Sequence, residues 1–284
     1  MAQRVWFITG ASSGFGRSLL ELVLRKGEIA VATLRKPEVL DELKTSHSSD
    51  KLLVLKLDVT KKAEIKEAFG RGLETFGRID VVFNNAGYGI LGEVEGTPED
   101  DARKMFDTNF WGAANVSQEA VRIFRERNPA GSGGRLFVTS SMVAVHPTLL
   151  VGYYSASKAA IDSLTQALKE ELDPEWNIKV TLIESGSFET SGRDNASHFP
   201  PYPAYDKPHL TTTKLREIIK NTPSRRGDPE KAVDRIYDLA GLEDPPMRLL
   251  LGKDAIGRLR AQQVNLLADA EKYESWSEGL GFTD

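Results

Sequence analysis

Tyr154 and Lys158 form a pair whose residue types and spacing could do proton chemistry. They lie four residues apart near the start of a predicted helix, so both side chains project from one face. A tyrosine hydroxyl titrates near about 10 and is a poor acid or base at neutral pH, but a neighbouring ammonium stabilises the phenolate and lowers its pKa. The pair therefore predicts a proton-transfer site. The alternative is an ordinary helix face, on which the aliphatic stem of the lysine lies along the surface and its charge reaches solvent.

Two further polar residues could join this pair. Ser141 ends the strand predicted before that helix, so we expect it at the mouth of the same cleft, where its hydroxyl could donate a hydrogen bond to a substrate carbonyl oxygen. Asn109 falls inside a long helix predicted over residues 98–127. Asparagine is unfavourable in mid-helix, which suggests a specific role there, although an exposed face would tolerate it.

A glycine-rich turn, Thr9-Gly-Ala-Ser-Ser-Gly-Phe-Gly16, joins an apolar strand over residues 5–8 to an amphipathic helix. Such a turn presents free backbone N–H groups and the positive end of the helix dipole, which together attract phosphate. The spacing is Gly-x3-Gly-x-Gly and not the Gly-x-Gly-x-x-Gly of the general dinucleotide fingerprint. A turn that needs positive φ would explain these glycines equally well, so the loop alone leaves phosphate binding open.

Arg35 follows the second predicted strand, over residues 28–34, and no carboxylate occurs until Glu38. In a dinucleotide fold an acidic residue at this place binds the ribose 2′-hydroxyl, whereas a basic residue favours a 2′-phosphate. The sequence thus favours NADP over NAD, with a solvated charge at a strand end as the alternative.

Strand and helix patterns alternate six times along the chain, which is typical of a parallel sheet covered by helices on both faces. Further strands are predicted over residues 51–57, 79–83, 135–140, 178–184 and 247–251, and helices over 63–76, 98–127, 152–172, 231–242 and 255–276. We therefore predict an α/β, Rossmann-type, doubly wound parallel sheet of about seven strands in three layers. Residues 1–284 are expected to form one domain.

Residues 187–223 interrupt the alternation with an irregular stretch that holds the proline and aromatic cluster Phe199 to Tyr205. A long irregular segment inside a compact domain is usually functional or disordered. We interpret it as a lid whose aromatic side chains face an apolar substrate, with a solvent-exposed loop as the alternative.

Composition restricts the function classes further. Acidic and basic residues are mixed over the 284 residues with a net charge of −4, so no basic face predicts nucleic-acid binding. No segment of about 18 apolar residues and no signal-peptide core is present, which favours a cytoplasmic protein without a membrane segment. The chain has no cysteine, and its four histidines lack metal-ligand spacing, so no metal site is predicted.

These motifs, in this order and spacing, resemble the short-chain dehydrogenase/reductase family over roughly residues 4–190. The resemblance rests on the glycine loop from Thr9 to Gly16, Asp58-Val59-Thr60, Asn84-Asn-Ala-Gly87, Asn109, Ser141 and Tyr154-Ser-Ala-Ser-Lys158. It implies an enzyme that transfers hydride between a nicotinamide cofactor and a carbonyl or alcohol.

The resemblance also implies a role for each catalytic residue. Tyr154 would protonate the carbonyl oxygen, and Ser141 would polarise that carbonyl. Lys158 would bind the ribose hydroxyls and lower the pKa of the tyrosine, while Asn109 would hold a water that links Lys158 to solvent. Tyr153 and Ser140 lie one residue outside the family register and are expected to have no such role.

Cofactor and substrate residues follow from the same resemblance. The cofactor residues would be Gly10, Ser12, Ser13, Phe15, Gly16, Arg35, Asp58, Val59, Asn85, Ala86, Gly87, Tyr154, Lys158 and Thr190, and the substrate residues Ser141, Tyr154 and Tyr88. The family commonly has Pro-Gly after its sixth strand, where this chain has Ser185-Gly186, which puts the path of that loop in question.

The residues and the resemblance together predict an NADPH-dependent oxidoreductase that interconverts an apolar or aromatic ketone or aldehyde and its alcohol. A dinucleotide-binding sensor or scaffold without turnover is the alternative, although such a protein would be expected to lose Tyr154 or Lys158. An epimerase or dehydratase acting on a nucleotide-sugar would favour a different glycine spacing and a larger C-terminal domain. The family often pairs through its two long helices, so a homodimer or homotetramer through residues 98–127 and 152–172 is expected.

Overall fold

The apolar runs of the chain form the strands of one parallel sheet, and the amphipathic segments between them form helices that cover it. The computed structural model describes residues 3–190, 196–221 and 227–282. Its strands are β1 (Val5–Thr9), β2 (Ile29–Leu34), β3 (Leu52–Lys56), β4 (Val81–Asn84), β5 (Ile90–Leu91), β6 (Gly134–Ser141), β7 (Ile178–Ser185), β8 (Ser197–His198) and β9 (Arg248–Leu251).

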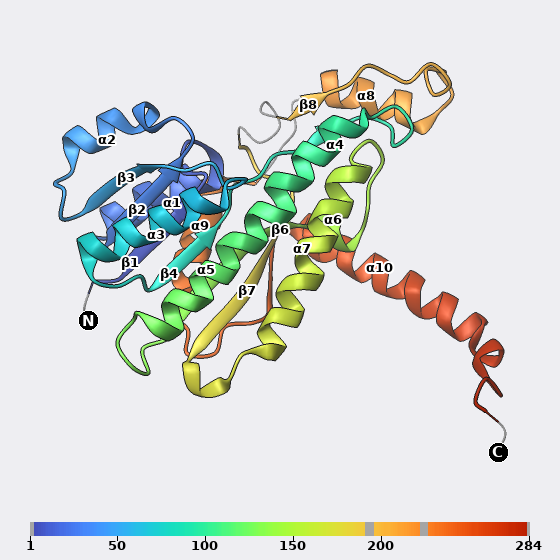
Figure 1. Cartoon of the computed structure of the whole chain (residues 1–284). Coiled ribbons are helices and arrows are strands. Elements are labelled where there is room, and N and C mark those ends of the chain that lie inside the picture. Colours follow the sequence, from blue (N-terminus) through green and yellow to red (C-terminus); the bar gives the residue numbers. More distant parts are fainter. Residues whose placement is uncertain (1–2, 191–195, 222–226, 283–284) are drawn as a thin grey trace.

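Helices connect these strands (Figure 1). The α-helices are α1 (Gly14–Arg25), α2 (Asp41–Ser46), α3 (Lys62–Phe76), α4 (Glu99–Phe106), α5 (Ala113–Glu126), α6 (Met142–Val145), α7 (Gly152–Glu171), α8 (Thr211–Asn221), α9 (Pro229–Leu239) and α10 (Lys253–Lys272). The shorter turns are the 3₁₀ turns η1 (Pro37–Leu40), η3 (Pro174–Trp176) and η4 (Glu274–Ser277) and the π turn η2 (Asp107–Gly112).

The main sheet has seven strands in the order β3-β2-β1-β4-β6-β7-β9, and every pairing in it is parallel. After β1, the strands β2 and β3 are added on one side of it. The chain then crosses back and adds β4, β6, β7 and β9 on the other side. The strand order therefore reverses between β1 and β4, and in open α/β sheets ligands bind in the crevice beyond the carboxyl ends of the strands at such a reversal. The predicted fold class, a doubly wound parallel sheet, is confirmed.

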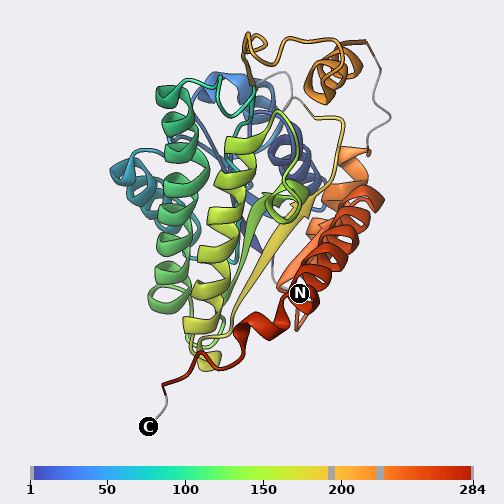
Figure 2. The ribbon, with the colours of Figure 1, turned by 90° about the vertical axis from the view of Figure 1, so that its right-hand side faces the viewer.

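The inner strands of the sheet are buried because helices cover both of its faces. All five residues of β1 are buried, as expected of a strand covered on its two faces. Phe7 stacks on Phe69 of α3 with ring centroids 4.0 Å apart, while the neighbouring Trp6 stacks on Tyr237 of α9 at 5.6 Å. One buried cluster joins the sheet to α3, α5 and α7, and a second joins it to α1 and α9. The two views show helices on both faces of the sheet (Figures 1 and 2).

Local side-chain bonds shape the starts of two helices. Lys61 precedes the first turn of α3, and the neighbouring Thr60 hydrogen-bonds the Asp58 carboxylate. Pro98 and not Thr97 precedes the first turn of α4, because the Thr97 hydroxyl donates to the Glu93 carbonyl at 2.8 Å. In both cases a local side-chain bond competes with the cap.

The predicted helix over residues 98–127 is a helical run whose winding changes in the middle. It consists of α4, the π turn η2 and α5, and Asn109 lies within the π turn. Single π turns inside α-helices occur often at functional sites, because they redirect side chains that regular winding would place elsewhere.

The predicted lid segment, residues 187–223, is partly described; residues 191–195 and 222–223 lie outside the described ranges. Its strand β8 pairs in parallel with β5, and α8 follows. Arg216 of α8 forms an ion pair with the buried Glu93 carboxylate at 2.6 Å and donates to the Phe199 carbonyl at 2.8 Å. These bonds fasten α8 to the turn that follows β5.

The aromatic side chains of the lid lie against that same turn. The ring of Tyr202 packs beside Gly96, where a Cβ would meet the Tyr202 Cβ at 2.7 Å. The Tyr205 hydroxyl donates to Glu95 at 3.0 Å. Both tyrosines therefore have partners in the turn over residues 93–96, and Tyr205 also lines a pocket of about 500 Å³ together with Leu149 and Leu210. That these aromatic side chains face a substrate stays a prediction.

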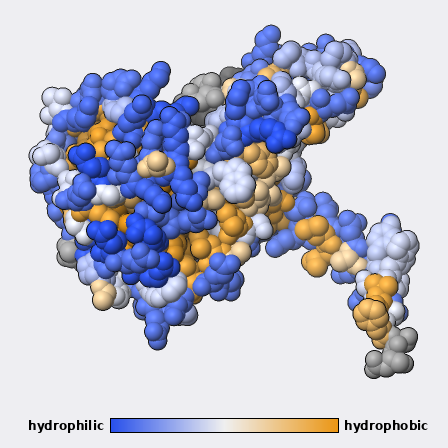
Figure 3. Space-filling model, in the orientation of Figure 1, coloured by the Kyte–Doolittle hydropathy of each residue, from blue (hydrophilic) through white to orange (hydrophobic). Residues whose placement is uncertain are grey.

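Helix α10 begins against the sheet and then leaves the body of the molecule (Figures 1 and 2). Ala255 is buried and Arg258 donates to the Thr148 hydroxyl at 2.6 Å, whereas the rest of the helix and the turn after it expose many apolar residues (Figure 3). The large exposed ones are Ile256, Val264, Leu266, Leu267, Tyr273, Trp276, Leu280 and Phe282. Within the described ranges, no helix is both long and apolar enough to cross a membrane.

Candidate active site

The glycine loop lies at the point where the strand order reverses. Gly10 and Gly14 have positive φ, +67° and +54°, which glycine adopts without strain. At Gly16 a Cβ would lie 2.2 Å from the Gly10 carbonyl oxygen, so the loop closes on itself only with glycine there. Each glycine of the predicted phosphate loop therefore has a steric reason for its position.

The N-terminus of α1 opens from this loop. Within the described residues, no side chain forms a capping hydrogen bond at this N-terminus, and the first turn of α1 carries no acidic residue. Its first N–H groups and its dipole are therefore available to an anion. Ser12 is exposed and Ser13 half-buried beside these groups, whereas Phe15 is buried, its ring edge-on to Phe188 with centroids 5.2 Å apart. Of the predicted loop residues, Phe15 therefore packs into the core and does not line an open surface.

The segment Asn85 to Gly87 connects the glycine loop to the catalytic residues. The Thr9 hydroxyl accepts the backbone N–H groups of Asn85 and Ala86 at 2.8 and 3.0 Å. A Cβ at Gly10 would meet the Ala86 Cα at 3.0 Å, and one at Gly87 would lie 3.5 Å from the Lys158 Nζ. The carboxyl ends of β1 and β4 therefore bring the predicted cofactor residues together in one cleft.

Ser141 and Tyr154 meet across the end of β6 and the start of α7. The Ser141 hydroxyl accepts the Val143 N–H at 3.4 Å and lies 3.5 Å from the Ser185 carbonyl, to which it donates. It also hydrogen-bonds the Tyr154 side chain, which lowers the pKa of that phenol. Burial raises the same pKa by more, so the net pKa of Tyr154 lies above its ordinary value.

Lys158 lies one helical turn beyond Tyr154. Its Nζ is 5.9 Å from the centroid of the Tyr154 ring and donates to the Thr139 carbonyl of β6 at 2.8 Å. Burial lowers the pKa of Lys158 to about 8, with the Asp162 carboxylate acting in the opposite direction. In this structure burial dominates the pKa of Tyr154, and the Lys158 ammonium donates to Thr139. The lowering of the tyrosine pKa by Lys158 stays a prediction.

The π turn aims Asn109 into the cleft. Its amide closes a ring with Tyr88, accepting the Tyr88 N–H at 3.0 Å and donating to the Tyr88 carbonyl at 2.8 Å, and it also donates to the Ser157 hydroxyl at 3.1 Å. The Asn109 Oδ1 is the atom that a Cβ at Gly87 would meet at 3.0 Å. The structure thus shows Asn109 joining the cofactor segment to α7; the water that the resemblance implies there stays a prediction.

Arg35 is exposed at the end of β2, near the predicted adenosine residues. Burial raises the pKa of Asp58, but hydrogen bonds from Thr60 and the charges of Lys61 and Arg35 bring it below its ordinary value. Val59 is buried against Gly112 of the π turn, where a Cβ would lie 2.8 Å from the Val59 Cγ2. The two predicted adenine contacts and the predicted 2′-phosphate ligand therefore share one end of the cleft.

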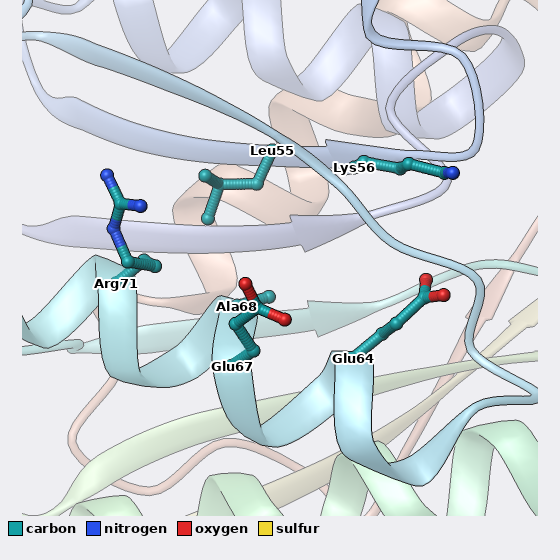
Figure 4. A pocket seen from close by; sticks show the side chains of 6 residues that line it. All are labelled: Leu55, Lys56, Glu64, Glu67, Ala68 and Arg71. Carbon is teal, nitrogen blue, oxygen red and sulfur yellow. The ribbon is translucent and has the colours of Figure 1, made fainter.

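A shallow hollow of about 260 Å³ lies outside this cleft, between β3 and α3 (Figure 4). Charged side chains surround it, and Glu64 among them accepts the Asp58 N–H at 2.8 Å. This bond lowers the pKa of Glu64 and holds the loop that carries Asp58. Glu64 therefore links the edge of this hollow to the predicted adenosine end of the cleft.

Contacts with α10 hold the start of the loop after β7, where the family commonly has proline. The Ser187 N–H donates to the Asp254 carboxylate of α10 at 2.7 Å, and Gly186 leaves the space that this carboxylate occupies, since a Cβ would lie 2.1 Å from its Oδ1. Thr190 then reaches the glycine loop, 3.4 Å from where a Cβ of Gly14 would lie. The Asp254 carboxylate thus fixes the backbone at Gly186 and Ser187; how this path compares with that of the proline-containing family members stays open.

Tyr88 is half-buried between the cofactor segment and the lid. Burial and the charges of Asp101 and Asp107 raise the pKa of its phenol, and Arg35 lowers it. The residue beside the Tyr154 ring is Gly89, where a Cβ would lie 3.9 Å from the Tyr154 Cδ2. The substrate role of Tyr88 stays a prediction.

Several residues that hold the site together were not predicted from the sequence. Thr9 holds the Asn85 segment, Ser157 accepts from Asn109, and the Thr139 carbonyl accepts from Lys158. Thr9 and Ser157 lie within the quoted motifs, so their positions were available as a signal. Nothing in the sequence distinguishes the carbonyl of Thr139 from any other.

Three observations indicate that the cleft fits a dinucleotide. The glycine loop leaves a cradle that Cβ atoms would fill, the N-terminus of α1 offers free N–H groups to a phosphate, and Lys158 and Arg35 offer cations at its two ends. Across the described part of the chain, no three histidine, aspartate or glutamate side chains are grouped as metal ligands would be.

Comparison with known proteins agrees with this geometry. Residues 4–200 match the family model of short chain dehydrogenases. An uncharacterised oxidoreductase of Schizosaccharomyces pombe is 35% identical over 279 residues, which cover 98% of this chain and 91% of that protein.

Solved structures show the same fold. A short-chain dehydrogenase from Streptomyces avermitilis superposes with a TM-score of 0.88 at 32% identity, and the match covers 99% of this chain and 100% of that one. A short chain dehydrogenase/reductase from Burkholderia phymatum in complex with NAD superposes with a TM-score of 0.78 at 22% identity, covering 94% and 95% of the two chains.

Proposed function

The chain belongs to the short-chain dehydrogenase family, and we propose that it is an NADPH-dependent oxidoreductase that interconverts a ketone or aldehyde and its alcohol. The observation that supports this most directly is the convergence of Ser141, Tyr154 and Lys158 at the carboxyl end of β6, beside the glycine loop. A dinucleotide bound on that loop would bring the hydride that the reduction needs.

Each residue has a defined task in the proposed reduction. The Ser141 hydroxyl donates a hydrogen bond to the substrate carbonyl oxygen, and the Tyr154 phenol gives its proton to the same oxygen as charge develops there. The raised pKa of Tyr154 keeps the phenol protonated and ready to donate. The Lys158 ammonium, near the ring, stabilises the phenolate that remains after proton transfer.

The proposed preference for NADPH rests on Arg35 at the end of β2, with its positive charge near Asp58. The similar Burkholderia structure holds NAD, so the likeness of fold does not itself favour either cofactor. We expect the substrate to be apolar or aromatic, and the segment over residues 187–223 to act as its lid.

We further propose that the chain pairs with itself through the helical run α4–η2–α5 and through α7, as a homodimer or homotetramer. These helices expose Trp111 and Leu164 by 59% and 39%, and large apolar side chains on a helix surface are typical of an interface. Nothing in the charge distribution of the chain favours nucleic acid as a partner.

Replacing Tyr154 by phenylalanine tests the proposed acid. We expect kcat for NADPH-dependent carbonyl reduction to fall by a factor of about 10² or more, because the substrate oxygen loses its proton donor. The affinity for NADPH, measured by calorimetry, should stay close to that of the wild type. Tyr153→Phe is the matched control, since it removes the neighbouring hydroxyl from the same helix turn.

The outcomes separate the two readings of the site. If Tyr154→Phe reduced carbonyls at nearly the wild-type rate, Tyr154 would not be the acid. If the wild type bound NADPH but reduced none of a panel of ketones and aldehydes, a cofactor-binding sensor or scaffold would be the better interpretation.

A further inference from the structure

A buried charge cluster lies directly behind the catalytic face. It consists of Lys158 and Asp162 of α7, Glu184 of β7 and Arg248 of β9. Lys158, Asp162 and Glu184 are exposed by only 5%, 4% and 0%. Charged residues are almost never buried to this degree unless they are paired, so the four side chains need an explanation together.

Contacts between neighbouring elements hold the cluster. The Arg248 Nη1 lies 3.2 Å from the Asp162 Oδ2 and also forms an ion pair with Glu184. Glu184 lies opposite Ser140 in the pairing of β7 with β6. Arg248 therefore joins α7 to the sheet from a strand that is 86 residues away in sequence from Asp162.

The spacing along α7 connects the cluster to the reacting groups. Tyr154, Lys158 and Asp162 follow one another at intervals of four residues, so they lie on one face of the helix. Lys158 donates to the Thr139 carbonyl of β6, and the Asp162 carboxylate, one turn further along the helix, is held by Arg248 of β9. The lysine and the aspartate are thus fixed by two different strands of the sheet behind the reacting groups.

The charges in the cluster cancel. Two cations and two carboxylates give no net charge, and removing one partner would leave a buried charge without compensation. On its own helix Lys158 has Tyr154 on one side and Asp162 on the other, and Arg248 and Glu184 lie beyond Asp162. From the other elements it faces the Thr139 carbonyl of β6 and, across Gly87, the amide of Asn109. Of these groups, Asp162 is the carboxylate whose charge acts on Lys158.

We propose that Asp162 is a positioning residue, which, held by Arg248, supplies the counter-charge that keeps Lys158 an ammonium ion in the working enzyme. The proposal rests on the proposed reductase function, because there Lys158 is required as a cation near Tyr154.

The titration behaviour of the pair agrees with this geometry. Burial lowers the pKa of Lys158 to about 8 against the effect of Asp162. Burial raises the pKa of Asp162 to about 6, against the effects of Ser140, Arg248 and Lys158. Between about 6 and 8 the lysine is therefore cationic and the aspartate anionic, which defines the pH range in which the pair is intact.

The competing explanation is that the Asp162–Arg248 pair only fastens α7 to β9. Such a fastening would stabilise the fold but leave the protonation of Lys158 unchanged. The distinguishing measurement is therefore the titration of Lys158 itself, with activity as a second readout.

The test compares Asp162→Asn with the wild-type full chain. The ¹³Cε resonance of Lys158, assigned through Lys158→Arg in lysine-labelled protein, is followed against pH. We expect its midpoint to fall by about one pH unit in Asp162→Asn, because the opposite charge is gone. The alkaline limb of kcat should move by the same amount, so that kcat at pH 8.5 falls about fivefold to tenfold while kcat at pH 6.5 changes little.

Two further variants sharpen this comparison. Asp162→Glu keeps the charge and should return the Lys158 midpoint toward the wild-type value, which a purely structural role would not require. Glu170→Gln removes a carboxylate from the exposed face of the same helix and should change neither readout. A Lys158 midpoint and an alkaline limb that both stay at wild-type values in Asp162→Asn overturn the proposal.

If Asp162→Asn does not fold, the wild-type protein alone tests whether Asp162 acts on Lys158. Coupled groups titrate in shared steps, so the ¹³Cε curve of Lys158 should show a second inflection where the ¹³Cγ of Asp162 titrates. Independent single-step curves would overturn the proposal. Wild-type protein that reduced no carbonyl would contradict the proposed function, whereas these curves would still decide the role of Asp162.

Discussion

Arg35 is the residue on which the proposed cofactor preference depends. It lies exposed at the end of β2, and its charge reaches Asp58 and Tyr88 at the adenosine end of the cleft. A guanidinium there can form charge-assisted hydrogen bonds with a 2′-phosphate, whereas NAD carries only a hydroxyl at that position.

Replacing Arg35 by aspartate should reverse this preference. We expect the ratio of kcat/KM for NADPH to that for NADH to fall by about 10- to 100-fold, because the phosphate loses a charged partner and meets a carboxylate. Steady-state kinetics with both cofactors would measure the ratio. Lys44→Asp, at an exposed position of α2, is the control for the change of net charge, and a ratio that Arg35→Asp leaves unaltered would remove Arg35 from the phosphate site.

At the scale of elements, the ion pair between Arg216 of α8 and Glu93 fastens the proposed lid. The Glu93 side chain is almost fully buried, so burial alone would raise its pKa; the Arg216 guanidinium and backbone N–H groups outweigh this effect and lower it. The folded pKa therefore lies below the unfolded one. The contribution of Glu93 to stability is then complete above the unfolded value, near about 4.5, and is lost as the pH falls through the folded value.

Arg216→Met should release the lid by leaving Glu93 buried without its partner. Breaking such a buried pair costs about 3 kcal/mol, and we expect faster amide hydrogen exchange over residues 199–221 together with a higher KM for bulky carbonyls. The control is Arg103→Met, which removes an exposed ion pair with Glu99 worth about 0.5 kcal/mol or less. Unchanged exchange in Arg216→Met would show that other contacts hold α8.

At the scale of the whole molecule, the outer surface of the helical run α4–η2–α5 is the proposed site of self-association. Trp111 projects from the π turn and is 59% exposed, with the Phe110 ring edge-on beside it at 4.8 Å between centroids. A large aromatic side chain held in this way is the kind of anchor that interfaces bury.

Trp111→Asp should therefore shift the protein toward smaller species in sedimentation velocity. An aspartate would place an unpaired charge in the apolar centre of the proposed interface, and such a change commonly costs more than 2 kcal/mol of association energy. Val39→Asp, at an exposed apolar position of η1 on the other side of the sheet, is the control. A mass that is the same in the wild type and in Trp111→Asp would place any interface elsewhere.

Much of this arrangement could be predicted because its signals are local in sequence. The alternation of strands and helices fixed the fold class, and the four-residue spacing of Tyr154 and Lys158 placed both side chains on one helix face. The glycine spacing identified the loop, whose steric reasons the structure supplies at Gly10, Gly14 and Gly16. Regular backbone periods make such residues neighbours whatever the rest of the chain does.

Other features depend on contacts between distant segments and could not be predicted. The sequence indicated that Asn109 had a task but not that a π turn would aim it at Tyr88. It likewise gave no sign that Asp254 would hold the loop after β7, where the family's proline is missing. Nor did it indicate that the turn over residues 93–96 would contact two of the aromatic side chains of the proposed lid.

The sequence by itself determined the parts of the site that lie within one element: a phosphate-binding turn, a helix bearing tyrosine and lysine, and a strand that ends in serine. Only the tertiary structure decided what surrounds them, because the order of strands in the sheet brings Arg248 and Glu184 behind Lys158 and sets the burial that shifts its pKa to about 8. Burial and long-range pairing are properties of the packed sheet, and no local spacing encodes them.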